Sequence, residues 1–171
     1  MKKLFVILAL ALFTCAALPA QNEKPLLMQD PTLSASHIAF AYGGEIWSVS
    51  RDGGVALRLT SGPGRKSNPR FSPDGKWIAF TAQYSGNFNV YVMPAEGGEP
   101  RQLTYGPGPD TVEGWTPDGK NVLFRSALKS YSPRYEQLYT ISIEGGSARE
   151  VPLPMGYEGS YSADGARLAY T

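Results

Sequence analysis

The turn Ser72-Pro73-Asp74-Gly75 decides the fold, because it returns twice along the 171-residue chain. It recurs as Thr116-Pro117-Asp118-Gly119 and as Ser162-Ala163-Asp164-Gly165. The turn aspartates are 44 and 46 residues apart, and an aromatic residue precedes each turn. A period of roughly 40–50 residues built from short strands is typical of a β-propeller with one four-stranded blade per repeat.

Three intervals stay constant within the repeat. Six residues separate the turn aspartate from the aromatic residue of the next strand, as between Asp74 and Phe80. Seven residues separate the start of the third strand from a Gly-Gly pair, as between Val90 and Gly97, and six more lead to Leu103 in the fourth strand. Because turn length sets strand register, these constant intervals predict the same pair of hairpins in every blade.

Each blade is predicted to contain four strands, the first of which ends at Phe71 or Trp115. The second strands are predicted over 77–82 and 121–126, the third over 88–93 and 137–142, and the fourth over 100–104 and 148–151. Upstream, Leu33, Ile38 and Phe40 occupy equivalent positions around a shortened first turn. This eroded copy indicates an atypical first blade, as terminal repeats often are.

The fold class predicted is all-β: a partial β-propeller of about three four-stranded blades from a six-bladed ring. The repeats cover residues 33–70, 71–114 and 115–160, and a further repeat starts over 161–171. Propellers close with roughly four to eight blades. We therefore expect this chain to be the N-terminal part of a longer polypeptide, truncated at its C-terminus.

The first 30 residues are expected to lie outside the propeller domain, which is assigned to 31–171. Residues 1–20 have a charged start, a continuous apolar run and small residues near Ala20, which is the layout of a secretory signal peptide. Residues 21–30 are assigned as a linker. The chain is thus expected to be exported, to the periplasm; Cys15, the single cysteine, offers an alternative as a lipoprotein anchor.

The charge is balanced along the chain. It has 16 basic and 15 acidic side chains, a net charge of +1, and no run of either sign. A nucleic-acid partner or a membrane-binding patch is therefore not expected, apart from the signal peptide.

Few residue types suited to catalysis or metal binding are present. His37, the only histidine, lies in the short turn before Ile38, where a surface residue is favoured over a metal ligand. The turn aspartates are isolated from one another, so capping of the turn is favoured over calcium binding. We expect no catalytic residue, cofactor or metal site in this chain.

Large aromatic residues offer two further interpretations. Trp47, Trp77 and Trp115 recur near equivalent repeat positions, so packing is favoured over ligand stacking. The segment Tyr131-Ser132-Pro133-Arg134-Tyr135 lies in the longest loop and is the candidate contact surface.

Loop length varies on one side of the expected ring. The second-to-third loops and the blade-to-blade links differ in length from repeat to repeat, whereas the Asp-Gly and Gly-Gly turns of the opposite side do not. The variable side is interpreted as the working face, because binding residues gather on loops of a rigid scaffold. Tolerated drift of an idle surface is the alternative.

The segment YSGNFNVYVMPAEGGEPRQLT (residues 84–104) resembles the propeller repeats of bacterial tricorn protease homologues. GGEIWSV (43–49) and RLT (58–60) are similar to the first blade of the same proteins. The resemblance covers about residues 25–171. It implies a multidomain serine peptidase with a six-bladed propeller, a second propeller, a PDZ-like module and a catalytic domain.

The resemblance also implies partners. The propeller would admit or filter peptide or protein substrates and would contact the remaining propeller and catalytic domains of the parent chain. The catalytic serine and histidine of the family lie far downstream, so no residue here corresponds to them.

Two alternatives remain open, because the Ser-Pro-Asp-Gly turn is shared more widely. One is a non-enzymatic, TolB-like periplasmic propeller that binds proteins, although TolB-type chains place a small α/β domain before the propeller. The other is the propeller of a prolyl-oligopeptidase-type exopeptidase.

Overall fold

The computed structural model describes residues 27–130, 132 and 135–171. The predicted signal peptide and most of the predicted linker lie outside these residues. Within them the chain forms three four-stranded antiparallel sheets and one two-stranded sheet. The strands are β1 (Gln29–Leu33), β2 (His37–Tyr42), β3 (Glu45–Ser50) and β4 (Leu57–Arg58); β5 (Lys66–Phe71), β6 (Trp77–Ala82), β7 (Asn89–Pro94) and β8 (Arg101–Gln102); β9 (Asp110–Trp115), β10 (Asn121–Ser126), β11 (Gln137–Ser142) and β12 (Arg149–Glu150); and β13 (Gly159–Tyr161) with β14 (Leu168–Tyr170).

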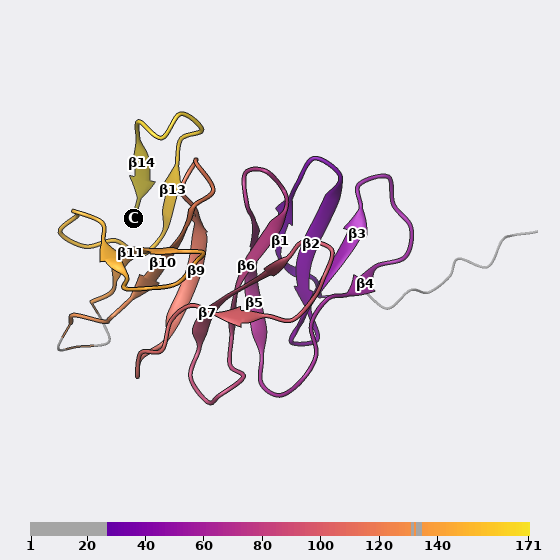
Figure 1. Cartoon of the computed structure of the whole chain (residues 1–171), viewed down its shortest axis with the longest axis horizontal. Helices are drawn as coiled ribbons and strands as arrows, with labels where there is room; N and C mark the ends of the chain where they lie inside the picture. The colour runs from indigo at the N-terminus through magenta and orange to yellow at the C-terminus, as the bar shows by residue number, and fades with distance from the viewer. Residues whose placement is uncertain (1–26, 131, 133–134) are drawn as a thin grey trace, which may run out of the picture.

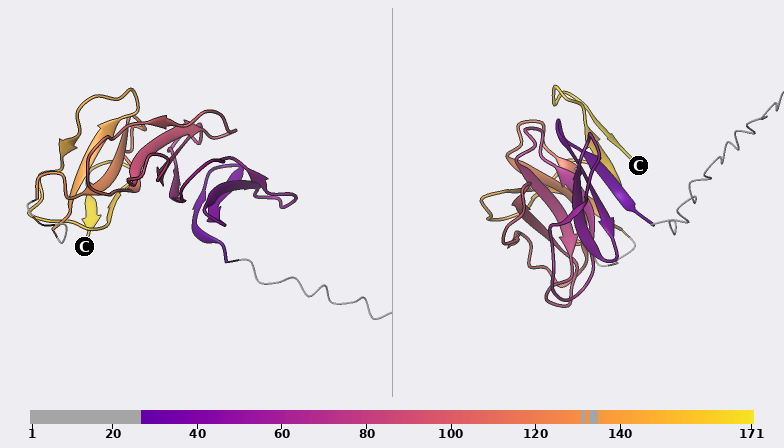
Figure 2. Two further views of the ribbon diagram at one scale, coloured as in Figure 1. Left: turned by 90° about the horizontal axis from the view of Figure 1, so that it is seen from below. Right: turned by 90° about the vertical axis from the view of Figure 1, so that its right-hand side faces the viewer.

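The four sheets follow one another along the chain and fan out side by side (Figures 1 and 2). Each full sheet keeps the sequence order of its strands, so it meanders from first strand to fourth. The first strands β1, β5, β9 and β13 lie next to one another. This arrangement confirms the predicted all-β partial propeller.

The predicted strands agree closely with the observed ones. β6, β10 and β11 have the predicted bounds, and β7 is shifted by one residue. The fourth strands are shorter than predicted, since β8 and β12 contain two residues each. Pro100 has no N–H to donate, which removes one end of β8. At its other end Leu103 N still donates to Val90 O at 2.8 Å, after which the chain leaves for the next blade.

The repeated turn is closed by its own side chains. Asp74 Oδ1 accepts hydrogen bonds from Ser72 Oγ at 2.6 Å and from Lys76 N at 3.1 Å. The backbone of Gly75 has a φ of 71°, which glycine adopts without steric cost. Asp118 and Asp164 repeat the same bonds. Each aspartate therefore caps its turn, as the sequence indicated.

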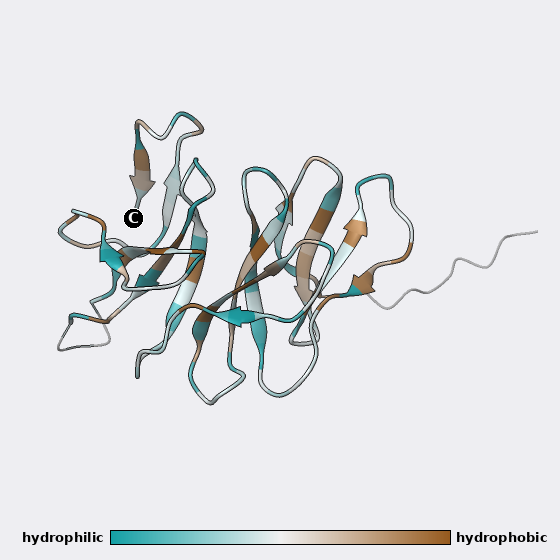
Figure 3. Cartoon of the chain, viewed as in Figure 1, coloured by the Kyte–Doolittle hydropathy of each residue, from teal (hydrophilic) through white to brown (hydrophobic). Residues whose placement is uncertain are grey.

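The core lies between neighbouring sheets. Phe80 stacks on Tyr91 with ring centroids 5.9 Å apart, and Phe124 stacks on Tyr139 at 5.7 Å in the next blade. These rings belong to second and third strands, which are buried on both faces between blades. Figure 3 shows hydrophilic segments within β5 and β9, two of the first strands.

Two first strands contain a bulge at an unusual backbone position. Asp30 in β1 and Asn68 in β5 both have a φ of 51°, in the left-handed region that non-glycine residues rarely adopt. A proline follows each of them, and strand pairing is interrupted at each position. β1 thus begins at Gln29, so the first blade includes the last two residues of the predicted linker.

Among the described residues, no helix has the length and apolar character needed to cross a bilayer.

Candidate functional site on the first strands

The adjoining first strands form a surface hollowed by two neighbouring cavities of about 600 and 580 Å³. Both are lined by Asp30, Asn68 and Arg125, so the bulges and one arginine stand at their common border. In a propeller the first strand of each blade lies nearest the ring axis. In a closed ring this surface would line the central passage, and we call it the charged wall.

Glu113 and Arg125 form the centre of the charged wall. Glu113 Oε1 lies 3.3 Å from Arg125 Nε. Glu136 Oε2 lies 3.3 Å from the same nitrogen. These contacts are ion pairs without hydrogen-bond geometry at Nε. The guanidinium also lies 6.0 Å from the centroid of the Tyr157 ring. Arg125 thus joins acidic and aromatic groups that come from different parts of the chain.

Burial changes the titration of Glu113. Desolvation raises the pKa of its carboxyl to about 7, although Arg125 and Arg70 oppose the shift and Glu158 and Glu136 add to it. The side chain is 10% exposed. The charged wall therefore contains a carboxyl group that gains or loses its proton near neutral pH.

Arg70 connects the second blade to the third. Its Nε donates to Glu113 O at 3.1 Å and its Nη1 donates to Pro69 O at 3.0 Å. In return, Trp115 Nε1 donates to Arg70 O at 2.9 Å. These bonds hold β5 beside β9 and fix the backbone of the charged wall. Trp115 packs in the core, as predicted, and its hydrogen bond to Arg70 O adds a role that the sequence did not indicate.

The bulges connect the first blade to the second in a similar way. Asn68 N donates to Asp30 Oδ2 at 3.2 Å, and Phe71 N donates to Thr32 Oγ1 at 3.3 Å. Strained backbone held by its surroundings is common where a protein binds something. The two cavities are lined by both acidic acceptors and cationic donors, which suits binding of polar chains.

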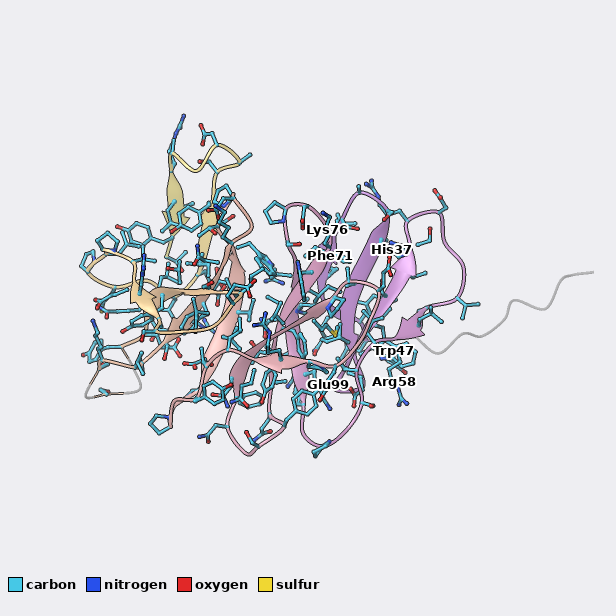
Figure 4. The ribbon with its side chains drawn as sticks, in the orientation of Figure 1. His37, Trp47, Arg58, Phe71, Lys76 and Glu99 are labelled. Atoms are coloured by element: carbon cyan, nitrogen blue, oxygen red, sulfur yellow. The ribbon has the colours of Figure 1, made fainter. Side chains whose placement is uncertain are left out.

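Apart from Trp115, the residues described next, which the sequence singled out, do not line the two cavities of this wall. His37 is exposed at the start of β2, and its Nδ1 is 2.9 Å from Ser36 Oγ (Figure 4). Trp47 is half-buried and donates from Nε1 to Tyr42 O at 3.0 Å. Trp77 packs at the edge of the core. In residues 27–130, 132 and 135–171, no group of three or more His, Cys, Asp or Glu residues could hold a metal ion.

The predicted contact surface is described only in part. Tyr131, Pro133 and Arg134 lie outside the described residues. Tyr135 is 53% exposed. The role of this segment as a contact surface stays a prediction.

Sequence reasoning missed Arg70, Glu113 and Arg125. A signal was available in the sequence. Phe71 and Trp115 are equivalent aromatic residues of two repeats; Arg70 directly precedes Phe71, and Glu113 lies two residues before Trp115. A comparison of the residues just before each of these aromatics would have singled out Arg70 and Glu113, whereas Arg125, in a second strand, had no such signal.

The fold and the charged wall define a β-propeller domain whose inner strands carry the polar surface. Residues 25–171 match the family described as the tricorn protease N-terminal beta propeller domain. The chain belongs to this family.

Individual relatives agree with the family. The chain is 35% identical over 86 residues to an uncharacterised protein, Atu1656, of Agrobacterium fabrum, covering 43% of this chain and 29% of that protein. It is 33% identical over 74 residues to tricorn protease homolog 1 of Streptomyces coelicolor, covering 43% of this chain and 7% of that protein. The chain thus spans less than a third of the length of these curated relatives.

Solved structures share the fold. TolB from Acinetobacter baumannii superimposes with a TM-score of 0.73 and 27% identity, covering 85% of this chain and 37% of that one. The crystal structure of the tricorn protease gives a TM-score of 0.72 and 24% identity, covering 82% of this chain and 15% of that one.

Proposed function

We propose that this chain is the N-terminal propeller portion of an exported, tricorn-like serine peptidase and that it acts in the access and binding of substrate peptides. The catalytic residues would belong to other domains of the parent protein. The observation that carries the proposal is the charged wall, with its cavities and its central pair Glu113 and Arg125. Membership of the tricorn propeller family supports the peptidase context.

The chemistry of the wall suits a peptide. An extended peptide offers N–H donors, C=O acceptors and a charge at each end. Asp30 and Glu113 present acceptors, while Arg70 and Arg125 present cationic donors. A passage lined in this way would bind peptides weakly at many positions, which allows them to move along it.

A second candidate is a protein-binding propeller without catalytic domains. The observation in its favour is the superposition on TolB at 27% identity over 85% of this chain. In that case the loops on the variable side would bind a folded partner, and peptides would not be hydrolysed.

Charge reversal at the wall tests the proposal. We expect Arg125→Glu, introduced into the full-length parent protein, to weaken peptide binding and slow peptide hydrolysis by at least about tenfold, since a charge-assisted contact contributes about 1.5–3 kcal/mol. Lys76→Glu is the matched control, because Lys76 is 78% exposed on the turn side. Equal peptide kinetics in both variants and the unmodified protein would contradict a role for the wall. Absence of any peptide hydrolysis would favour the second candidate.

A further inference from the structure

The link between the first and second blades encloses a lysine. Lys66 is fully buried, and its Nζ donates to Glu45 Oε1 at 3.1 Å. It also donates to three consecutive carbonyls of the link, Gly62 O at 2.7 Å, Pro63 O at 3.1 Å and Gly64 O at 3.2 Å. The ammonium lies 4.7 Å from the centroid of the Tyr84 ring, within range of a cation–π contact. The first link is therefore a complete binding site for an alkylammonium group, filled by the chain itself.

The second link repeats the backbone of the first. Gly106-Pro107-Gly108 stands where Gly62-Pro63-Gly64 stands one repeat earlier. Val90 N donates to Thr104 Oγ1 at 2.9 Å, and the equivalent bond from Ile46 N to Thr60 Oγ1 is 2.8 Å. The two links thus share one hydrogen-bonded framework.

The side chains of the second link differ from those of the first, and no lysine occupies the position equivalent to Lys66. Asp110 replaces Lys66, and its N donates to Phe88 O at 2.9 Å as Lys66 N does to Gly44 O at 2.8 Å. Asn89 replaces Glu45, and Leu128 replaces Tyr84. A cavity of about 150 Å³ opens here, which we call the link pocket; its lining includes Leu103, Tyr105, Phe124, Leu128, Gly106 and Asp110.

The link pocket has an acidic residue in its lining. Asp110 is 3% exposed, and burial raises the pKa of its carboxyl while bonds to Ser126 and Thr104 oppose the shift. Among the described residues no ion pair includes Asp110, and a buried carboxylate that is not paired with a cation is costly.

The repeat position of Glu45 is occupied by Asn89, which lies outside the lining of the link pocket. Asn89 is 3% exposed, and within the described part of the chain its Oδ1 has no hydrogen-bond partner. Its Nδ2 donates to Asn87 O at 3.3 Å, which fixes the orientation of the amide. Buried oxygens without a donor are rare in folded proteins, so Oδ1 indicates a missing donor.

We propose that the link pocket binds the side chain of a lysine carried by a peptide, with the ammonium held by Asp110, the acidic residue of its lining. The apolar side of the link pocket, formed by Leu103, Phe124 and Leu128, would pack against the methylene groups of the bound lysine. Lysine side chains commonly bury these groups on apolar surface while the ammonium meets polar groups. Tyr105 and Leu128, 77% and 52% exposed, border the pocket and come from the loops of the variable side. The pocket is separate from the charged wall, and the inference holds whether or not the protein hydrolyses peptides.

Two small probes test the occupant in the unmodified protein. N-acetyl-lysine methylamide carries the ammonium, and N-acetyl-norleucine methylamide has a similar stem without charge. By isothermal titration calorimetry we expect the lysine probe to bind at least about tenfold more tightly, since a hydrogen bond to a charged group is stronger than a neutral one. Equal affinities, or no binding of the lysine probe, would overturn the proposal.

Variants locate the site. We expect Asp110→Asn to lose the preference for the lysine probe, whereas Asp118→Asn, the same change at an exposed turn, keeps it. The double variant N89E/D110K copies the first link and should fill the pocket with its own lysine, which abolishes binding. A preference that survives in either pocket variant would reject this location. Arg125→Glu, which alters the charged wall, should leave the preference intact, so failure of this proposal and failure of the proposed function are distinguishable.

Discussion

Glu113 Oε1 reaches Arg125 Nε at 3.3 Å because Glu113 is the extra residue of a bulge. Val112 pairs with Phe124 and Gly114 pairs with Leu123, which leaves Glu113 between them without a partner strand residue. A bulge turns a side chain away from the regular alternation of the strand. The central pair of the charged wall thus depends on a local irregularity of β9.

The first prediction concerns the pH dependence of stability. The pKa of Glu113 rises from its ordinary value of 4.5 to about 7 in the folded protein, because burial disfavours the charged form. The folded state then binds the proton more tightly than the unfolded state. The contribution of Glu113 to the free energy of unfolding is therefore fully present below pH 4.5 and is lost as the pH rises through about 7.

Glu113→Gln removes this titration. We expect the free energy of unfolding of the unmodified protein to fall by about 2–3 kcal/mol more than that of the variant between pH 4.5 and 8. Urea unfolding at a series of pH values measures the difference. Parallel pH profiles for the two proteins would show that Glu113 titrates at its ordinary value.

A second prediction addresses the ion pair of the first link. Lys66→Met should destabilise the protein by about 3–5 kcal/mol, because it leaves the Glu45 carboxylate without its cation. Adding Glu45→Gln should restore part of this loss. A double-mutant cycle in urea measures the coupling free energy, and strictly additive effects would mean that the carbonyls alone hold Lys66.

Two equivalent glycines provide a third prediction. A Cβ at Gly64, where φ is +71°, would lie 2.0 Å from Gln83 O, whereas a Cβ at Gly108 meets nothing within 4 Å. We expect Gly64→Ala to cost more than about 2 kcal/mol. Gly108→Ala should stay within about 0.5 kcal/mol of the unmodified protein. Similar melting temperatures for the two variants would contradict the close approach of the link to Gln83.

The fourth prediction concerns the repeated turn. The hydrogen bond from Thr116 lowers the pKa of Asp118, and the bond from Lys120 N lowers it further. This stabilisation is present above pH 3.8 and is lost as the pH falls through the depressed value.

Asp118→Ala should therefore lower the free energy of unfolding near neutral pH by about 0.5–1 kcal/mol, because solvent screens this exposed carboxylate. The variant should also flatten the acid limb of the stability profile. Glu96→Ala, at another exposed turn, serves as the control in thermal unfolding across pH. Equal losses in the two variants would mean that the Asp118 cap contributes nothing specific.

The architecture could be predicted from spacing alone. The distance from Asp74 to Phe80 and from Val90 to Gly97 sets the hairpins, and the same distances in each repeat give the same register. These intervals predicted the bounds of β6, β10 and β11. Turn chemistry was decisive because Asp and Gly act locally.

The polar sites could not be predicted in this way. Glu113 faces Arg125 only because of a bulge, and alternation along a strand does not indicate where a bulge lies. Lys66 and Asp110 occupy one repeat position with opposite charge, and their side-chain partners differ: Glu45 for Lys66, and Ser126 and Thr104 for Asp110. Such pairings follow from blade packing, which sequence spacing leaves undetermined.

The outer strands of the blades have a consequence for behaviour at high concentration. β4, β8 and β12 contain two residues each, so each of the three complete blades that the structure describes ends in a very short outer strand. Long exposed edges recruit strands from other molecules and start aggregation. Because the outer strand of each complete blade has only two residues, it offers little edge for pairing with another molecule. A protein made of many such sheets can therefore remain unaggregated without other segments to cover its outer edges.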